Sequence, residues 1–354
     1  ARGSTGFLLR LPLTVARYVG ENIGLTDRVA RFEKSFGEER SRLGSIDFRV
    51  LSNSGLDRVL LRVDRLLDES GQVMLNVYGN LLATVVLLRG VLAVVAREGD
   101  AERLERDLLT GLADVVSAAP GLSLWHIAEM ARADEPAARM LLASDPSSLT
   151  VDQLPEGPTR RAVQRFLEAY GYRGAREAEI GEPRWSEDAT LPFATLRAHL
   201  SRASRGLSPV DIEQKQRQVR DAAQQELERR LPGPTKIAAR HLLSLVQRFT
   251  RLRERLRSHV VRVLGLFRAV GLDVSRRLAV REPSAGDDGA FYLTVDELHA
   301  YLRGDLGSLT PVIRRRRLQL ERDRALPAPP DTFVGFPPAV PEPPKSQDAL
   351  QGLA

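Results

Sequence analysis

The sequence predicts a mainly α-helical protein with many helices, and three observations support this fold class. Apolar residues recur at spacings of three and four through most of the 354-residue chain, and almost no stretch alternates with the period of a strand. Aromatic residues make up only 5% of the chain, so the core must be built from Leu, Val and Ala, which suits helices. With 43% hydrophobic and 28% charged residues, the composition is that of an ordinary globular protein.

The basic residues are mostly arginine, and acidic residues are mixed among them. The formal net charge is +6, yet only four of the 52 basic residues are lysines, and the arginines alternate with Glu and Asp along most of the chain. A nucleic-acid-binding protein usually gathers its basic residues on one face, so this function stays a minor alternative. The chain has no cysteine, which excludes disulfides, thiolate metal sites and a cysteine nucleophile.

Amphipathic helices are expected from the beginning of the chain. The apolar period predicts helices at residues 7–17, 27–42 and 56–69. Another is expected at 100–117, where Asp100 is a suitable N-cap. The first residues show no basic-then-apolar signal pattern, and we therefore expect a cytoplasmic location without contact to a membrane.

The most apolar segment is residues 72–96. Its length could span a bilayer, but Arg89 lies within it, and an arginine at the centre of a bilayer costs about 2.5–3.5 kcal/mol. We therefore expect a buried helix of the core. By default its residues are part of that core, among them Leu75, Val77, Tyr78, Leu81 and Leu82.

Three further helices are expected in the second half of the chain. Residues 159–170 form a short one, and residues 209–231 form one that is polar on nearly every side. A Pro-Gly-Pro turn separates it from the longest helix, at 236–278, whose apolar stripe runs from Leu242 to Val270. Two long helices around such a turn predict an antiparallel helical hairpin.

The last part of the chain changes in composition. Eight of the eighteen residues from Pro327 to Pro344 are proline, which is typical of an extended interdomain linker. We expect a helical domain over residues 1–326, a linker over 327–345, and the start of a further domain over 346–354. On this interpretation the chain is part of a longer protein.

The chain lacks the common motifs of self-contained catalysis. It has no phosphate-binding GxxxxGK[ST] loop, no GxGxxG and no GxSxG. Its five histidines are far apart, without the HxxxH or HExxH spacing of a zinc site. We therefore expect no catalytic residue, no metal ligand and no bound cofactor in this chain alone.

Residues 170–188, YGYRGAREAEIGEPRWSED, interrupt the run of helices. They resemble a motif of phosphoenolpyruvate-utilising, PEP synthase-like enzymes, the group that includes rifampicin phosphotransferases: G-x-R-G-x-G-E-[IL]-D-[IL], then Pro-Arg-Trp, after a helix that ends in Tyr. The matching positions are Gly171, Arg173, Gly174, Glu177, Ile180, Pro183, Arg184 and Trp185. Arg176 stands where the family has Gly, and Glu179 where it has Asp.

Four other segments are similar to the same family, in the same order. They are residues 107–131, 251–270, 291–304 and 314–335. The resemblance implies an ATP- and Mg²⁺-dependent phosphotransferase with a nucleotide-binding domain and a swivelling phosphohistidine domain. This chain is similar to the helical region between those two partner domains, which binds a small phosphoryl acceptor in the rifampicin phosphotransferase type.

The resemblance also suggests binding residues. Arg253 and Arg257 lie four residues apart on the longest helix, so they share a face. The resemblance implies that basic residues at this position face the acceptor, and a solvated helix face beside Glu254 is the alternative. Tyr78, Leu81 and Leu82 are candidates for the wall of an apolar pocket. For Arg173, contact with a phosphate or a moving domain competes with a buried ion pair that orders the loop.

Several alternatives stay open at this point. The protein could be a non-catalytic helical scaffold or regulatory protein that has kept the fold without the chemistry. Trp185 is expected to pack against a helix. The four arginines at 314–317 are expected to form a solvated or domain-docking face.

Overall fold

The computed structural model describes residues 24–97, 99–111, 119–201 and 208–326, and a few isolated positions near the two ends of the chain. The described residues contain eleven α-helices and several short 3-10 turns, and no strand, which confirms the predicted mainly α class. The predicted helix at 7–17, the end of the one at 100–117, and the ranges 327–345 and 346–354 lie wholly or largely outside the described residues.

The chain divides into two compact units. Unit 1 contains residues 1–47 and 58–269, and unit 2 contains residues 48–57 and 270–354. Two long helices, α3 (Asn53–Val95) and α11 (Gly233–Arg281), contribute residues to both units. The domain boundaries predicted from the sequence stay a prediction.

Unit 1 holds seven further described helices. They are α2 (Leu25–Gly44), α4 (Ala101–Leu109), α6 (Ala119–Arg132), α7 (Glu135–Ala143), α8 (Pro158–Tyr170), α9 (Thr190–Ser201) and α10 (Pro209–Arg230). The helices predicted at 27–42, 159–170, 209–231 and 236–278 are thus confirmed, with small shifts at their ends. Asp100 occupies the N-cap position of α4, but its carboxylate accepts from the Arg97 N–H outside the helix rather than capping it.

Helix α3 is one continuous helix of 43 residues where the sequence predicted two. Gly71 lies in its interior, and the cost of about 1 kcal/mol for a helical glycine is too small to break a helix held by packing. Val77 is fully buried, whereas Leu75 is 68% and Leu82 66% exposed, so the expectation that the whole segment is core was wrong. Only the side of an amphipathic helix that faces the core is buried, and Leu75 and Leu82 lie outside it.

By length and composition, α3 is the one described helix that could cross a membrane. Only 28% of its most apolar 18-residue window is buried in the structure. Such a helix also occurs in proteins that never enter a membrane, so this finding does not test the location predicted from the sequence.

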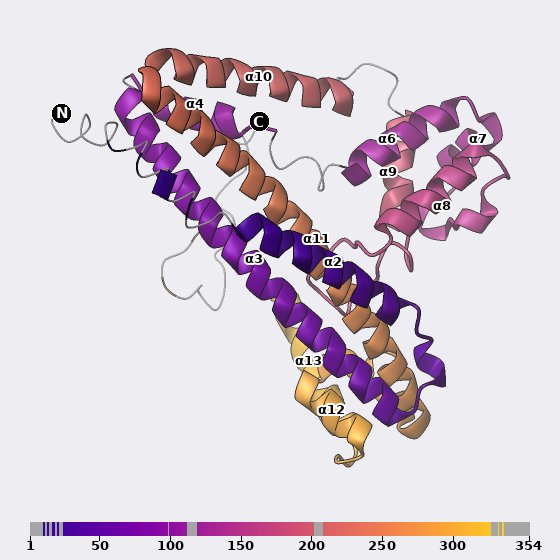
Figure 1. Ribbon diagram of the computed structural model, residues 1–354. Helices are drawn as coiled ribbons and strands as arrows, with labels where there is room; N and C mark the ends of the chain where they lie inside the picture. The colour runs from indigo at the N-terminus through magenta and orange to yellow at the C-terminus, as the bar shows by residue number, and fades with distance from the viewer. Residues whose placement is uncertain are drawn as a thin grey trace. The chain divides into compact units, whose positions relative to one another are not determined.

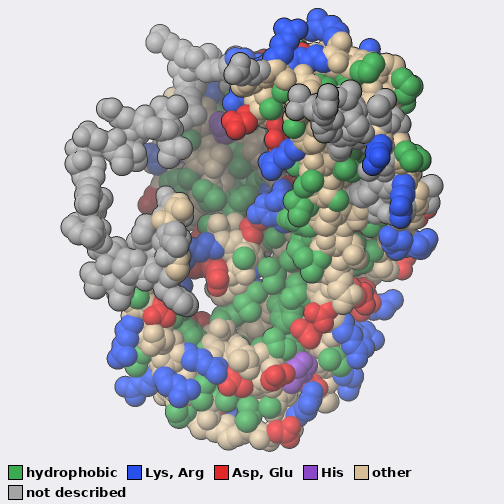
Figure 2. Space-filling model, turned by 90° about the vertical axis from the view of Figure 1, so that its left-hand side faces the viewer, with side chains coloured by type: hydrophobic (Ala, Val, Ile, Leu, Met, Phe, Trp, Pro, Cys, Tyr) green, Lys and Arg blue, Asp and Glu red, His purple; other side chains and the backbone are tan. Residues whose placement is uncertain are grey.

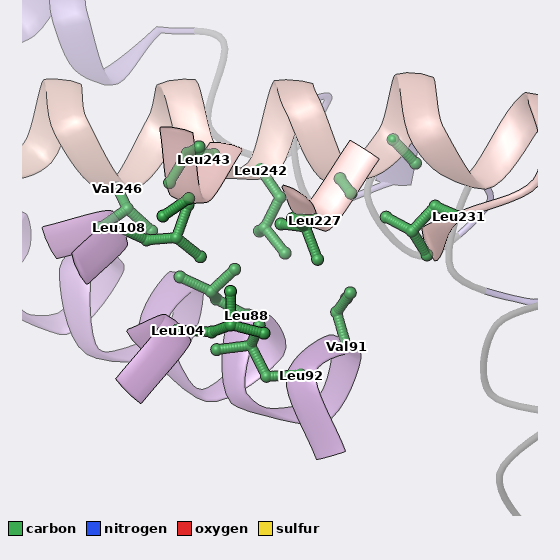
Figure 3. Packing of buried hydrophobic residues seen from close by; sticks show 13 residues of the cluster. Leu88, Val91, Leu92, Leu104, Leu108, Leu227, Leu231, Leu242, Leu243 and Val246 are labelled. Atoms are coloured by element: carbon green, nitrogen blue, oxygen red, sulfur yellow. The ribbon is translucent and has the colours of Figure 1, made fainter. Parts of the chain in front are cut away.

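The first core cluster of unit 1 joins the C-terminal part of α3 to α4, α10 and the first part of α11. Figure 3 shows Leu88 and Leu92 of α3 pointing toward Leu104 and Leu108 of α4, with Leu242 and Val246 of α11 on the other side. Leucines at helical spacing on four helices interdigitate here, and burial of each leucine contributes about 1.5–3 kcal/mol.

The polar helix α10 and the long helix α11 meet at this cluster. Ser208 caps α10, because its hydroxyl accepts a hydrogen bond from the Asp211 N–H. At the other end, Leu231 follows the last helical residue and has an extended backbone. Leu227 of α10 and Leu231 belong to the same buried cluster as Leu242 of α11, and the two helices diverge beyond the turn (Figure 1). The predicted hairpin is therefore packed at its turn and open at its far end.

The second core cluster of unit 1 lies among the short helices α6 to α9, which gather into one group in Figure 1. Phe166 of α8 and Phe193 of α9 are buried at its centre, surrounded by leucine and alanine side chains. The 170–188 loop leaves α8 at the edge of this group, so its first residues are anchored in a packed core.

Unit 2 contains α12 (Val295–Arg303), α13 (Thr310–Ala325) and the ends of the two long helices. Glu282 accepts hydrogen bonds from the Leu309 and Thr310 N–H groups at the start of α13. Burial acts to raise the pKa of Glu282, but these bonds and those from two hydroxyls outweigh it and lower the pKa to about 2. In the basic run, Arg316 binds Glu297 and Arg317 binds Asp288, so only its first two arginines are exposed.

Candidate functional site

The 170–188 loop folds back on itself directly after α8. The Trp185 N–H donates to the Arg173 carbonyl at 2.7 Å, and the Ser186 N–H donates to the Gly171 carbonyl at 3.0 Å. Such cross-loop bonds satisfy backbone groups that would otherwise be unpaired. The loop is therefore ordered by its own backbone before any side chain is considered.

Two glycines make this close approach possible. A Cβ atom at residue 171 would lie 2.3 Å from the Leu167 carbonyl oxygen and 2.9 Å from the Ser186 Cβ. At residue 174 it would lie 2.9 Å from the Pro183 carbonyl oxygen. Arg176, which departs from the family motif, is exposed and forms an ion pair with Glu182 at 3.6 Å.

The Trp185 side chain joins the loop to the second core cluster. Its ring stacks on Phe166 of α8 with the centroids 5.9 Å apart and the planes at 20°. Stacked aromatic pairs contribute about 0.5–1.5 kcal/mol beyond their buried area. The predicted packing role of Trp185 is confirmed.

Arg268 of α11 holds the other end of the loop. Its guanidinium donates to both carboxylate oxygens of Glu187 at 2.6–3.0 Å and to the Ile180 carbonyl at 2.9 Å. The Arg268 side chain is 9% exposed, so these bonds lie in a poorly hydrated place. A forked guanidinium suits this three-point contact in a way that a lysine would not.

Arg184, a residue of the loop itself, is only 3% exposed. Its Nη1 donates to the Glu177 carbonyl at 3.1 Å, while its Nε and Nη2 make no hydrogen bond with any described residue. Burial lowers the pKa of the Arg184 guanidinium, and the nearby charge of Arg268 lowers it further. The site thus concentrates positive charge in a small volume.

The structure brings two of the predicted binding arginines together through one carboxylate. Glu177 accepts from the Arg173 Nε at 2.7 Å and from the Arg257 Nη2 at 3.4 Å. The side chains of Arg173 and Glu177 are 13% and 16% exposed, and that of Arg257 is 50% exposed. Arg173 therefore forms the ion pair that orders the loop, and Arg257 presents part of its guanidinium to solvent.

Arg253 lies one turn before Arg257 on α11 and faces α3. Its guanidinium carbon is 5.0 Å from the centre of the Tyr78 ring, a cation–π contact, and its Nη1 donates to Glu254 at 2.9 Å. Of the predicted pocket residues, Leu81 packs against the first core cluster and Leu82 is exposed. Whether Tyr78, Leu81 and Leu82 form an acceptor pocket stays a prediction.

Several residues of this region were not singled out from the sequence. Arg268 follows the stripe residue Phe267, and only the fold shows that it reaches a loop 81 residues earlier. The Tyr172 hydroxyl lies 2.7 Å from the Ser258 hydroxyl, and Arg262 lies over the Tyr172 ring at 3.9 Å. A signal did exist for Arg184, which belongs to the Pro-Arg-Trp part of the motif.

Charges of both signs are mixed on the surface. On the face shown in Figure 2, arginine and lysine side chains stand among acidic ones rather than forming a single basic field. This mixture gives no support to the nucleic-acid alternative.

Comparison with known families identifies a match over half of the chain. A family model described as the rifampicin phosphotransferase fourth domain matches residues 72–254. The matched range includes Tyr78, Arg173 and Arg253, and it ends three residues before Arg257.

Two curated proteins are also similar. A rifampicin phosphotransferase of Streptomyces sviceus is 26% identical over 196 residues, which are 53% of this chain and 22% of that protein. The prodigiosin synthesizing transferase PigC of Serratia marcescens is 22% identical over 333 residues, which are 89% of this chain and 36% of that protein. The chain thus spans between about a fifth and about a third of the length of these relatives.

Proposed function

The chain belongs to the family of the rifampicin phosphotransferase fourth domain, and on this premise we propose that it positions a small phosphoryl acceptor within an ATP-dependent, PEP synthase-like phosphotransferase. In this proposal a nucleotide-binding domain and a phosphohistidine domain of the same enzyme are its partners. The acceptor carries a hydroxyl group, and the surface between α3, α11 and the 170–188 loop holds it.

One observation carries the proposal. Arg253 lies over Tyr78 of α3, and one turn later Arg257 reaches Glu177, which in turn binds Arg173. An aromatic ring, two partly exposed guanidiniums and an ordered loop therefore follow one another along a single face of α11. An apolar body with a hydroxyl fits such a surface, because the ring offers an apolar face and the guanidiniums offer hydrogen-bond donors.

The two arginines would act on the charge that moves during phosphoryl transfer. The acceptor oxygen forms a bond to phosphorus as the bond from phosphorus to the carrier histidine breaks, and the acceptor hydroxyl loses its proton. Negative charge on the phosphoryl oxygens is stabilised by fixed cations. Arg257 is held by Glu177 and Arg253 by Glu254, so both guanidiniums are oriented before the acceptor binds.

The proposal places ATP and Mg²⁺ outside this chain. Among the described residues, no group of three or more His, Asp or Glu side chains could hold a metal ion. We therefore derive no step through a metal on these residues, and we assign to them only binding and orientation of the acceptor.

A substitution in the full-length enzyme tests the role of Arg253. We expect Arg253→Ala to lower the rate of acceptor phosphorylation by about 10²-fold, as loss of a comparable electrostatic contact does. ATP-dependent phosphorylation of the carrier histidine should continue, because that step needs none of these residues. Rapid-quench measurement of both steps with labelled ATP separates them.

Two further variants make the result interpretable. Arg251→Ala removes an exposed arginine two positions away on α11 and should leave both steps unchanged. Arg253→Lys keeps a positive charge beside the buried Glu254, so it separates loss of catalysis from loss of folding. Acceptor phosphorylation at the wild-type rate in Arg253→Ala would contradict the assignment.

A further inference from the structure

A second cavity of unit 1 lies between α2 and α11, and none of the residues of the proposed acceptor surface lines it. Its volume is about 530 Å³. Glu33, Phe36 and Arg40 of α2 line one side, and Arg255, Ser258 and Arg262 of α11 line the other. A cavity of this size accommodates a small molecule rather than a single ion.

The charges of the cavity are unbalanced. Glu33 is the one acidic residue that lines it, and it already binds Arg255 through a 3.0 Å contact between Oε1 and Nε. Arg40 and Arg262 form no ion pair with any residue in the described part of the chain. The cavity therefore carries two guanidinium groups whose positive charge no carboxylate neutralises.

One of these guanidiniums is held in place. The carbon of the Arg262 guanidinium lies 3.9 Å from the centre of the Tyr172 ring, and the Tyr172 hydroxyl lies 2.7 Å from the Ser258 hydroxyl. The stacked arginine keeps its N–H edge available for a ligand while its flat face is occupied. Ser258 adds a hydroxyl beside it that can also donate.

Phe36 and His259 also line the cavity. The Phe36 side chain is 2% exposed, and its ring centre lies 4.4 Å from that of His259. Burial lowers the pKa of His259, although the carboxylate of Glu33 acts in the opposite direction.

We propose that this cavity binds a small phosphomonoester, with its phosphate between Arg40 and Arg262 and its organic part in the remaining volume of the cavity. Two unpaired guanidiniums match the two negative charges of a phosphomonoester and can each offer two parallel donors to its oxygens. A carboxylate would neutralise only one of them. The inference does not depend on the acceptor site, because it concerns other residues and needs neither ATP nor a further domain.

Calorimetric titration of this chain with phenyl phosphate tests the inference, at constant ionic strength in chloride. We expect saturable binding, weakened about tenfold or more by Arg40→Gln or Arg262→Gln, since each variant removes the charge-assisted hydrogen bonds of one guanidinium to the phosphate. Arg31→Gln is the matched control: it removes the same charge from α2, nine residues from Arg40 and so on the opposite side of the helix. The affinity of Arg31→Gln for phenyl phosphate should equal that of the wild type.

Two comparison ligands define the chemical class. Inorganic phosphate should bind more weakly than phenyl phosphate, because it has no organic part to fill the rest of the cavity, and benzoate should bind more weakly still. Absence of saturable binding, an equal loss in Arg31→Gln and Arg40→Gln, or equal affinity for benzoate and phenyl phosphate would each overturn the inference. Arg40 forms no ion pair with a described residue, so its substitution tests the site without disturbing the fold.

Discussion

Two arginine-rich clusters in unit 1 use the same residue in different ways. In the first, here called the α4–α10 ring, Arg103 and Arg230 face Asp100 and Glu226, and Arg103 also pairs with Asp107, so carboxylates match both positive charges. In the second, here called the loop cluster, Arg173 and Arg257 share the Glu177 carboxylate, Arg268 binds Glu187, and Arg184 donates to the Glu177 carbonyl.

The hydrogen-bond partners differ in the same way. In the ring, carboxylates accept most of the guanidinium hydrogen bonds. In the loop cluster, the Glu177 and Ile180 carbonyls accept bonds from Arg184 and Arg268, and two N–H groups of Arg184 have no partner among the described residues. A balanced ring suffices to join two helices, whereas an excess of arginine is expensive to bury and is more typical of a functional site.

The largest effect is expected from Arg268→Ala in the loop cluster. The substitution leaves Glu187 and the Ile180 carbonyl without their shared donor, and we expect a loss of about 3 kcal/mol in the free energy of unfolding. This loss is at the lower end of the range for breaking a buried ion pair, because the Glu187 side chain is 35% exposed. Both tryptophans, Trp125 and Trp185, lie in unit 1, so urea unfolding followed by fluorescence reports on this unit. A loss below 1 kcal/mol would show that the loop cluster stabilises the fold no more than the α4–α10 ring does.

A smaller effect is expected from Arg230→Ala in the α4–α10 ring. Its guanidinium binds Asp100 at 2.7 Å and also contacts Glu226, and Arg103 remains to neutralise Glu226 after the substitution. We expect a loss of about 1 kcal/mol, as for other partly hydrated ion pairs. The same urea titration measures it, with Arg106→Ala, at a side chain 74% exposed on α4, as the control. A loss as large as that of Arg268→Ala would remove the contrast between the clusters.

The smallest effect is a difference in pH dependence. The hydrogen bond from Arg230 lowers the pKa of Asp100, and that from Arg103 lowers the pKa of Glu226, from ordinary values of 3.8 and 4.5. A lowered carboxylate pKa stabilises the fold above the unfolded value, and this contribution is lost as the pH falls through the folded value. The difference in unfolding free energy between the wild type and Arg230→Ala should therefore shrink from pH 7 to pH 3.

The loop cluster supplies the comparison for that measurement. Part of the contribution of Arg268 to the free energy of unfolding comes from its hydrogen bond to the Ile180 carbonyl, which does not titrate. The difference in unfolding free energy between the wild type and Arg268→Ala should therefore keep a larger fraction of its pH 7 value at pH 3 than the difference for Arg230→Ala does. Equal proportional losses for both variants would show that the two clusters respond to acid in the same way.

The sequence predicted those features that depend on neighbours along the chain. The apolar stripe placed α11, and the Pro-Gly-Pro turn placed the end of α10, within a few residues of their observed positions. The sequence predicted α3 less well, as two helices at 56–69 and 72–96, because the apolar pattern changes between them while the backbone continues as one helix. Burial of Leu75 and Leu82 was predicted wrongly, since composition does not reveal which side of a helix has a neighbour.

The site could be predicted only in part, for the same reason. Arg253 and Arg257 share a face because they are four residues apart, and the structure adds their partners Tyr78 and Glu177. The clamp from Arg268 to Glu187 joins residues 81 positions apart, and the pair of Arg255 and Glu33 joins residues 222 apart. Local periodicity carries no information about such pairs.

The crowding at Gly171 and Gly174 has a consequence at the level of the gene. Glycine codons begin with GG, so every missense change of one base in them introduces a residue with a Cβ atom. At residue 171 that atom would overlap the Leu167 carbonyl oxygen, and at residue 174 it would press on the Pro183 carbonyl oxygen. Missense mutations of these two codons are therefore expected to be more costly than mutations of the codons for the exposed Ala175 and Arg176.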